Sequence, residues 1–259
     1  MTEEVLVARD GPVMTITLNR PEKYNALTFG MYARLAEICE GDARDGSVRV
    51  IVITGAGAKA FAAGTDIAQF RAFTSPDDGL RYEAEVDRIL SAIEHCPVPM
   101  IAAIAGACTG GGAAIAACCD MRIATRDARY GFPIARTLGN CLSATSLQRL
   151  TGLMGAPRVV DLLFTSRLMT ADDCFAAGLV TEIVDDHPGL MARANELAHQ
   201  IAGFAPLTLS TTKELMRRIR DAAPKVDDHD LVARVYTSAD FREGLDAFLS
   251  KRKPQWTGR

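Results

Sequence analysis

The sequence lacks the features that would direct it to nucleic acid, to a membrane or to export. Its 259 residues carry a formal net charge of −3, so no basic surplus suggests a nucleic acid or an acidic membrane as partner. The apolar run that comes nearest to a membrane span, residues 100–117, is interrupted by glycines and a threonine. The first residues, MTEEVLVARDG, have neither the basic nor the apolar segment of a signal peptide. We therefore expect a cytoplasmic protein.

The sequence also lacks the spacings of a metal site or a disulfide framework. Its seven cysteines are odd in number and none forms a C-x-x-C pair. They stand among apolar residues, which predicts small buried thiols in a reducing compartment. The four histidines show no metal-ligand spacing. We expect no metal.

The organising stretch runs from Met100 to Ala117 and reads MIAAIAGACTGGGAAIAA. An apolar run bounded by proline and glycine predicts a buried strand, and a glycine turn and a helix follow it. Such a junction leaves backbone N–H groups unpaired at the positive end of a helix dipole, where an oxyanion can bind. The alternative is a tight turn whose glycines only permit close packing.

A second stretch of the same kind lies about fifty residues earlier, where Phe61–Ile67 (FAAGTDI) follows the apolar strand 50–54. With these pieces together, the chain resembles the enoyl-CoA hydratase/isomerase (crotonase) superfamily. The matching segments occur in family order along nearly the whole chain: NRPEKYNAL (19–27), FAAGTDI (61–67), AGACTGGGAAIAACCDMRIA (105–124) and SADFREGLDAFLSKRKPQW (238–256).

The expected fold is α/β. Strands and helices alternate to about residue 185, beginning with a hairpin over 5–9 and 13–18. Thr28 is predicted to cap a helix that runs to about Arg44, and a second helix, from Ser75-Pro76 to about 95, has a cap and an acidic first turn. The resemblance implies a spiral of repeated ββα units for residues 1–187. Apolar spacing predicts only helices in residues 188–259, which by analogy form an oligomerisation region that completes the acyl-CoA site of a neighbour. The implied assembly is a homotrimer or a dimer of trimers.

In the resembling family, two backbone N–H groups hold the thioester oxygen. Those positions here are Thr65 and Gly111, and only their backbones are implicated; a structural role for the Thr65 hydroxyl is an equal alternative. One such donor is typically worth roughly 3 kcal/mol. If Gly111 acts through its N–H alone, replacement by alanine should matter less than replacement by proline.

The resemblance also places residues around coenzyme A, the only cofactor-like group that we expect. For Lys23 the alternative is a plain surface lysine, for Asp66 a structural cap, and for Lys251 and Arg252 a solvated basic tail. The predicted CoA-binding residues are Lys23, Tyr24, Ala26, Ala62, Gly64, Asp66, Ile67, Gly110, Pro133, Ile134, Leu138, Phe241 and Lys251.

Two departures from the family pattern concern the reaction. A typical hydratase has one glutamate where this chain has Ala114, and a second after the proline of the segment YGFPIARTL, where this chain has Ile134. That segment is one residue longer than usual, and neither alignment supplies a carboxylate. Hydration needs one group that takes a proton from water and one that gives a proton to carbon. We therefore expect slow or absent hydration.

Other polar residues lie close to this gap in the sequence. Arg136 is predicted to bind a substrate carboxylate, since guanidinium pairs with carboxylate in bidentate fashion. Asn140 and Ser143 are either site residues or helix caps. For Cys141 a buried small side chain is the preferred interpretation.

The predicted function is that of an enzyme acting on an acyl-CoA thioester through an oxyanion intermediate. Isomerisation, decarboxylation and hydrolysis remain open as the reaction. The alternative is a degenerate family member that binds acyl-CoA, or serves as a scaffold, without turnover. No nucleic acid or membrane partner is expected.

Overall fold

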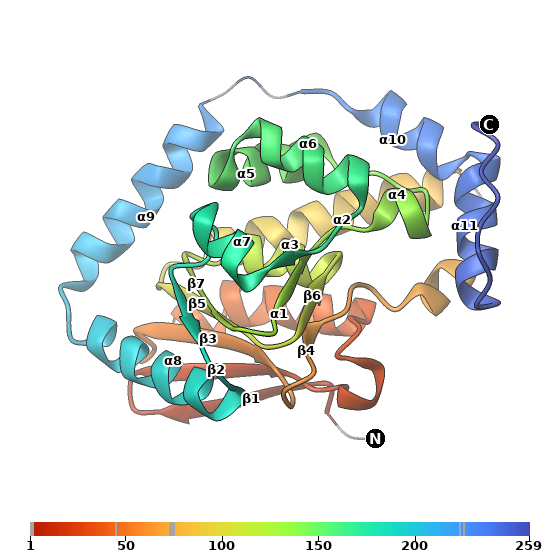
Figure 1. Cartoon of the computed structure of the whole chain (residues 1–259). Helices are drawn as coiled ribbons and strands as arrows, with labels where there is room; N and C mark the ends of the chain where they lie inside the picture. The colour runs from red at the N-terminus through yellow and green to blue at the C-terminus, as the bar shows by residue number, and fades with distance from the viewer. Residues whose placement is uncertain (1–2, 45, 73–75, 223, 225) are drawn as a thin grey trace.

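The computed structural model describes residues 3–44, 46–72, 76–222, 224 and 226–259. Its strands form two sheets, one of six strands in the order β1-β2-β3-β5-β7-β10 and one of four in the order β4-β6-β8-β9 (Figure 1). Pairing is parallel except for β1 with β2 and β8 with β9. The strands are β1 Val5–Asp10, β2 Val13–Leu18, β3 Val50–Gly55, β4 Ala60–Ala62, β5 Met100–Ile104, β6 Ala107–Thr109, β7 Met121–Thr125, β8 Arg129–Gly131, β9 Met169–Thr170 and β10 Glu182–Val184.

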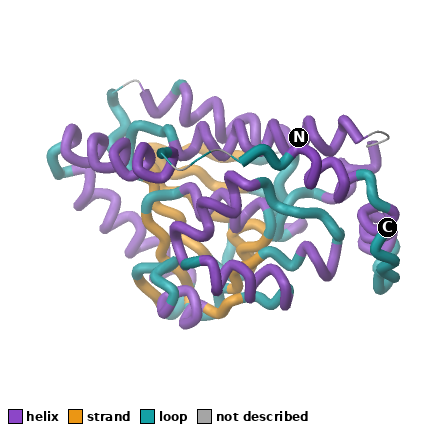
Figure 2. The backbone as a smooth tube through the Cα atoms, turned by 90° about the horizontal axis from the view of Figure 1, so that it is seen from above, coloured by secondary structure: helices purple, strands orange, loops and turns teal. Residues whose placement is uncertain are grey.

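In the view from above, helices cover much of the strands and extend beyond them on either side (Figure 2). Short 3₁₀ segments are η1 Pro21–Lys23, η2 Asp42–Arg44 and η3 Ile67–Ala72. The α-helices are α1 Phe29–Glu40, α2 Pro76–Glu94, α3 Gly111–Cys118, α4 Ile134–Thr137, α5 Ala144–Met154, α6 Ala156–Thr165, α7 Ala171–Ala176, α8 His187–Ala202, α9 Pro206–Asp221, α10 His229–Tyr236 and α11 Ala239–Leu249.

Successive strand pairs build the predicted spiral. Each of β3-β4, β5-β6 and β7-β8 places its first strand in the six-stranded sheet and its second in the four-stranded sheet, and a helix follows each pair. Each repeat therefore advances both sheets by one strand. The α/β spiral of ββα units predicted from the sequence is confirmed.

The six-stranded sheet is covered on both faces, as the apolar run of β3 predicts. Alternate side chains of a strand point to opposite faces. Ile51 and Ile53 lie in the core with α1, α2 and α3, whereas Val50 and Val52 pack with Leu190 and other residues of α8. The boundary predicted at residue 188 thus falls at the start of a helix that belongs to the core.

Of two helix boundaries expected from the sequence, one differs in the structure and the other lies outside the described residues. The helix capped by Thr28 ends at Glu40 rather than near residue 44, because Gly41 ends it and η2 follows. The Thr28 hydroxyl accepts from the Met31 N–H at 3.1 Å, which confirms the cap. The expected cap at Ser75 lies outside the described residues.

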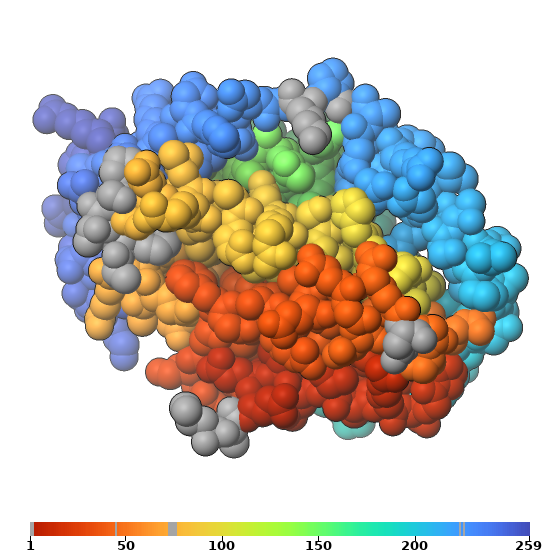
Figure 3. Space-filling view, turned by 180° about the vertical axis from the view of Figure 1, so that it is seen from behind, coloured from red at the N-terminus to blue at the C-terminus, as the bar shows by residue number. Residues whose placement is uncertain are grey.

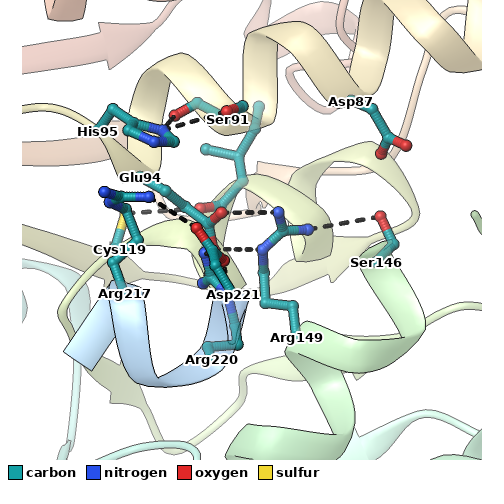
Figure 4. A network of polar contacts seen from close by, with 12 residues as sticks. Asp87, Ser91, Glu94, His95, Cys119, Ser146, Arg149, Arg217, Arg220 and Asp221 are labelled. Atoms are coloured by element: carbon teal, nitrogen blue, oxygen red, sulfur yellow. Dashed lines mark hydrogen bonds and ion pairs between the residues drawn. The ribbon is translucent and has the colours of Figure 1, made fainter. Parts of the chain in front are cut away.

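The last three helices wrap around the rest of the chain, with α9 along one side and α11 along the opposite side (Figures 1 and 3). A buried ion pair holds α9: Glu94 of α2 accepts from Arg149 of α5 at 2.5 Å and from Arg220 of α9 at 2.5 Å (Figure 4). Helices α10 and α11 lie against the chain's own α2, η3 and α4. Among the described residues, no helix combines the length and apolarity needed to cross a bilayer.

Candidate functional site

The two glycine turns predicted from the sequence lie side by side. They follow β4 and β6, which pair in parallel, with Ala62 opposite Cys108. Parallel strands end at the same edge of a sheet, so the turns meet there. A Cβ on Gly110 would lie 3.4 Å from the Cα atom of Gly64.

The junction depends on glycine at several positions. Gly64 has φ +103° and Gly110 has φ +51°, a region that side chains rarely adopt. A Cβ on Gly112 would lie 2.3 Å from the carbonyl oxygen of Ala62. Ala62, predicted to line the CoA channel, is therefore fully buried beneath the start of α3.

Two backbone donors remain open at this junction. Gly111 is the first residue of α3, so its N–H has no partner within the helix. The Thr65 N–H is flanked by the bonds Leu27 N–H to Gly64 O and Asp66 N–H to Leu27 O, both 2.8 Å. Neither the Thr65 nor the Gly111 N–H donates to a residue that the structure describes.

The Thr65 side chain lies in a chain of hydroxyl groups. Its Oγ1 is 3.0 Å from the Tyr32 hydroxyl and 3.0 Å from the Tyr82 hydroxyl. Burial raises the pKa of both tyrosines, so both stay protonated. The Thr65 hydroxyl is thus held by two tyrosines, in keeping with a structural role.

The Tyr32 hydroxyl also makes alanine at position 111 less tolerable than the sequence predicts. An ideal Cβ on Gly111 would lie 1.8 Å from the Tyr32 oxygen, far inside contact distance. Alanine at this position therefore cannot be accommodated unless Tyr32 moves. The sequence alone suggested a tolerant first turn of a helix, because the contact comes from α1, about eighty residues earlier.

The loop before α1 lies directly against the first turn. The Tyr24 carbonyl accepts from the Ala63 N–H at 3.0 Å, so the predicted residues Lys23, Tyr24 and Ala26 adjoin the predicted segment 62–67. Lys23 and Tyr24 are exposed, and Ala26 is half-buried. Asn25, which sequence reasoning passed over, fixes this loop.

Asn25 is fully buried in a left-handed conformation, with φ +55°. Its Nδ2 donates to the Ala60 carbonyl at 2.7 Å and its Oδ1 accepts from the Arg20 N–H at 3.0 Å. Asparagine tolerates this backbone region, and the N-A dipeptide after Tyr24 was the available signal.

Asp66 has structural partners on both oxygens. Oδ2 pairs with Arg20 at 2.9 Å and Oδ1 accepts from the Ala68 N–H at 3.2 Å, at the start of η3. This position favours the structural alternative for Asp66. Ile67, the first residue of η3, is half-buried.

The segment after β8 is divided between interior and surface. Pro133 and Ile134 are half-buried at the start of α4. Leu138 is buried, because α11 packs closely on it. A Cβ on Gly244 of α11 would lie 2.4 Å from the Leu138 carbonyl oxygen. Arg136 projects from α4 with an exposed side chain and has no partner among the described residues. Its assignment as a carboxylate-binding residue stays a prediction.

Aromatic rings from distant segments cover the Thr65 turn. Phe241 of α11 is buried, with its ring centroid 4.8 Å from that of Tyr236 and 6.3 Å from that of Phe70. Phe70 in turn lies 4.8 Å from Tyr82. Phe241 is therefore an interior residue, whereas Lys251, at the other end of α11, is exposed.

A cleft of about 360 Å³ opens between η3 and α11. Arg71 and Arg242 line it from the two sides, together with Asp246 and Ser250. Within the described part of the chain, neither arginine side chain has a carboxylate partner. The cleft thus presents two guanidinium groups and one carboxylate, that of Asp246, which pairs with Arg252 at 2.5 Å.

The polar residues that follow α4 turn out to differ in role. Ser143 caps α5, as one prediction has it, by accepting from the Ser146 N–H at 3.2 Å. Asn140 instead donates from Nδ2 to the Tyr236 hydroxyl at 3.3 Å. Burial raises the pKa of the Cys141 thiol to about 11, so this thiol stays protonated at neutral pH. Ala114, nine-tenths buried at the start of α3, has no acid–base group to offer.

One carboxyl group near the site was missed in the sequence. Glu83 of α2 accepts from the Tyr236 hydroxyl of α10. Burial, together with the nearby Asp87 and Asp228 carboxyls, raises its pKa to about 7, although Tyr236 acts in the opposite direction. No motif marks Glu83, since its partner lies 153 residues away in the chain.

Comparison with known proteins agrees with this geometry. Residues 8–259 match the family model described as enoyl-CoA hydratase/isomerase. The chain belongs to that superfamily. The chain is 30% identical to a short-chain-enoyl-CoA hydratase of Clostridium acetobutylicum, over 96% of its own length and 95% of the relative's. It is 32% identical to a 1,2-epoxyphenylacetyl-CoA isomerase of Escherichia coli, over all of both chains.

Solved structures give the same superfamily. A methylmalonyl-CoA decarboxylase in complex with 2-nitronate-propionyl-CoA superposes with a TM-score of 0.91 at 28% identity, covering all of both chains. An enoyl-CoA hydratase/carnithine racemase from Magnetospirillum magneticum is more similar in sequence, at 34%, but has a TM-score of 0.81 over 100% of this chain and 97% of its own. Relatives of this superfamily member thus carry names of hydratases, isomerases and decarboxylases.

Proposed function

We propose that this superfamily member is an enzyme that acts on acyl-CoA thioesters and stabilises a thioester enolate or oxyanion with the Thr65 and Gly111 N–H groups. The observation that carries the proposal is the pair of open donors on adjacent turns, one of them at a helix N-terminus. Placing negative charge on the thioester oxygen makes the neighbouring carbon acidic, and two aligned donors stabilise that charge. Relatives named for acyl-CoA substrates support the choice of substrate.

The reaction that we propose is not ordinary hydration. With Ala114 and Ile134 at the expected glutamate positions, neither of these positions supplies a carboxyl group. Isomerisation, decarboxylation and hydrolysis remain, and the names of the isomerase and decarboxylase relatives are compatible with the first two. The lack of the two glutamates also supports a second candidate function, that of a family member that binds acyl-CoA without turnover.

The cleft between η3 and α11 is the proposed position of the CoA phosphates. Arg71 and Arg242 have no internal carboxylate partner, and guanidinium groups bind phosphate in bidentate fashion. The predicted residues Lys251 and Phe241 lie on the same helix and its end. In this proposal one chain binds both the nucleotide and the thioester ends of the ligand.

Calorimetric titration with butanoyl-CoA tests the proposal, and we expect binding in the micromolar range, about −8 kcal/mol. Replacing both Arg71 and Arg242 by alanine should weaken binding about tenfold or more and reduce its salt dependence. Arg88→Ala, which removes an exposed arginine of α2, is the matched control and should leave binding unchanged. No binding across a panel of acyl chain lengths would count against the proposed function. Hydrogen–deuterium exchange at the acyl α-carbon separates the enzyme from the binding-only candidate.

A further inference from the structure

Three carboxyl groups gather between α2, α10 and the start of α5, and their partners differ. Asp87 accepts from the Ser143 hydroxyl at 2.8 Å, and Asp228 accepts from the Ala144 N–H at 2.5 Å. Both therefore lie at the N-terminus of α5, where the helix dipole favours negative charge. Glu83 has no such helix terminus, and its partner is the Tyr236 hydroxyl.

The surroundings of Glu83 are neutral or negative. Among the described residues, the charged groups that act on it are the carboxyls of Asp87 and Asp228, and no cation is among them, so none of these groups compensates an ionised Glu83. Burial next to two other carboxyls raises the pKa of Glu83 to about 7. The facing groups are Tyr32, Tyr82, Asp87, Cys141, Asp228 and Tyr236.

Asn140 extends this pair into a chain that serves both protonation states. Its Nδ2 donates to the Tyr236 hydroxyl, while its Oδ1 is buried and has no partner among the described residues. When Glu83 is ionised, Tyr236 donates to it, as in the structure. When Glu83 is protonated, it can donate to Tyr236, and Tyr236 can donate to Oδ1 once the Asn140 amide has turned. A proton can thus be held at Glu83 or released without leaving Tyr236 unpaired.

The ring of Tyr82 lies between the Glu83, Tyr236 and Asn140 side chains and the turn that carries the Thr65 donor. Tyr82, next to Glu83 on α2, bonds the Thr65 hydroxyl at 3.0 Å, and its ring lies 6.4 Å from that of Tyr236. Glu83 is thus a half-buried carboxyl that follows, on α2, the tyrosine bonded to the Thr65 turn, and its charge acts on the Tyr32 hydroxyl beside Gly111.

We propose that Glu83 is the acid–base residue of this site, an inference that rests on the proposed function. Its carboxylate accepts a proton from the carbon next to the thioester carbonyl. The electron pair of the broken C–H bond forms the enolate double bond, and the carbonyl oxygen takes the negative charge between the two N–H donors. The protonated Glu83 returns the proton to the same carbon, or to the γ-carbon of a 3-enoyl chain, which moves the double bond. One carboxyl group suffices for this transfer, whereas hydration requires two functions.

The test is exchange of the α-hydrogens of butanoyl-CoA in D₂O, followed by NMR between about pH 5.5 and 8.5. We expect the wild-type rate to rise through an inflection near the Glu83 pKa of about 7. Glu83→Gln should lower the rate by about 10²-fold or more and abolish the inflection. Glu85→Gln, an exposed glutamate of the same helix that pairs with Arg88, is the matched control and should keep both.

Tyr236→Phe should change the pH of the inflection, which would stay the same if Glu83 had only a structural role. The Tyr236 hydroxyl stabilises the Glu83 carboxylate, so its removal should shift the inflection to higher pH. A Glu83→Gln protein with native melting, unchanged rate and unchanged inflection would overturn the inference. If that variant does not fold, an unshifted inflection in Tyr236→Phe overturns it instead.

Calorimetry keeps this inference separate from the proposed function. Wild-type protein that binds butanoyl-CoA but shows no exchange would refute the role of Glu83 and leave acyl-CoA binding in place. Protein that does not bind any acyl-CoA would refute the proposed function itself.

Discussion

The contact between Gly111 and Tyr32 gives a prediction that can be worked out in free energy. Gly111→Ala adds one methyl group whose ideal position is 1.8 Å from the Tyr32 oxygen. Tyr32 is itself buried in the core and cannot move away without disturbing α1. Overpacking of this kind costs about 1–3 kcal/mol. We expect Gly111→Ala to lower the free energy of unfolding by about 2–3 kcal/mol.

The same contact predicts that a second substitution relieves the first. Tyr32→Phe removes the oxygen and one hydrogen bond to Thr65, at a cost of about 1 kcal/mol. The new methyl group would then meet only the Tyr32 Cζ position and the Thr65 Oγ1, each at 3.1 Å, which is tight but can be relieved by small shifts. In the double variant the two costs should therefore not add, and we expect a coupling free energy of about 1–2 kcal/mol.

A double-mutant cycle measured by urea denaturation tests this prediction. The four proteins are wild type, the two single variants and the double variant, compared at one protein concentration so that assembly does not alter the result. If Gly111→Ala costs the same in the presence and absence of the Tyr32 hydroxyl, the proposed clash is not the cause. The N–H of Gly111 survives in every member of the cycle, so acyl-CoA binding should be weakened only where the Thr65 turn is displaced.

Four further predictions concern stability, its pH dependence, the reaction and assembly. Glu94→Gln should lower the free energy of unfolding by about 3–5 kcal/mol, because it leaves Arg149 as a buried unpaired charge. The control Glu85→Gln, at an exposed position, should change it by less than about 0.5 kcal/mol. Equal melting temperatures of the two variants would contradict this prediction. Because the Glu83 pKa is raised, the folded state holds a proton that the unfolded state has lost, so stability should fall between about pH 4.5 and 7, and Glu83→Gln should remove that part of the fall. Hydration of crotonyl-CoA, followed by loss of enoyl absorbance, should be slow or absent; a rate ordinary for an efficient hydratase would show that another residue replaces the missing glutamates. Light scattering should show a trimer or a dimer of trimers, and Met216→Glu on the exposed face of α9 should weaken it; a stable wild-type monomer would contradict the assembly.

Patterns that act over short distances in the sequence allowed the fold to be predicted. The apolar run of β3, the Thr28 cap and the glycine turns each act within a few residues, and each has its expected local structure. The adjacency of the two turns followed from the family resemblance, since parallel pairing of β4 with β6 leaves no mark in either short strand.

The parts of the site that could not be predicted depend on contacts between distant segments. Glu83 lies on an amphipathic helix, where a glutamate ordinarily faces water, but here it is half-buried and bonded to Tyr236 of α10. The Tyr32 hydroxyl beside Gly111 is likewise supplied by another helix. Periodicity identifies which face of a helix is apolar, but it does not identify the polar group that a second helix will enclose.

The position of the C-terminal helices bears on how assembly and the site are related. α10 brings Tyr236 to Glu83, and α11 brings Phe241 into the aromatic cluster over Thr65, so this chain's own helices supply both residues. α9 differs, since none of its residues is buried, and Leu215, Met216 and Ile219, which lie on one side of the helix, are 53%, 65% and 69% exposed. This apolar face of α9 is the one that we assign to contact with a neighbouring copy, because it is larger than the single exposed side chains Leu231 of α10 and Phe248 of α11. If so, contact between copies and completion of the site are assigned to different helices, and disrupting the α9 face should alter the molecular mass in solution while leaving the pH inflection assigned to Glu83 in place.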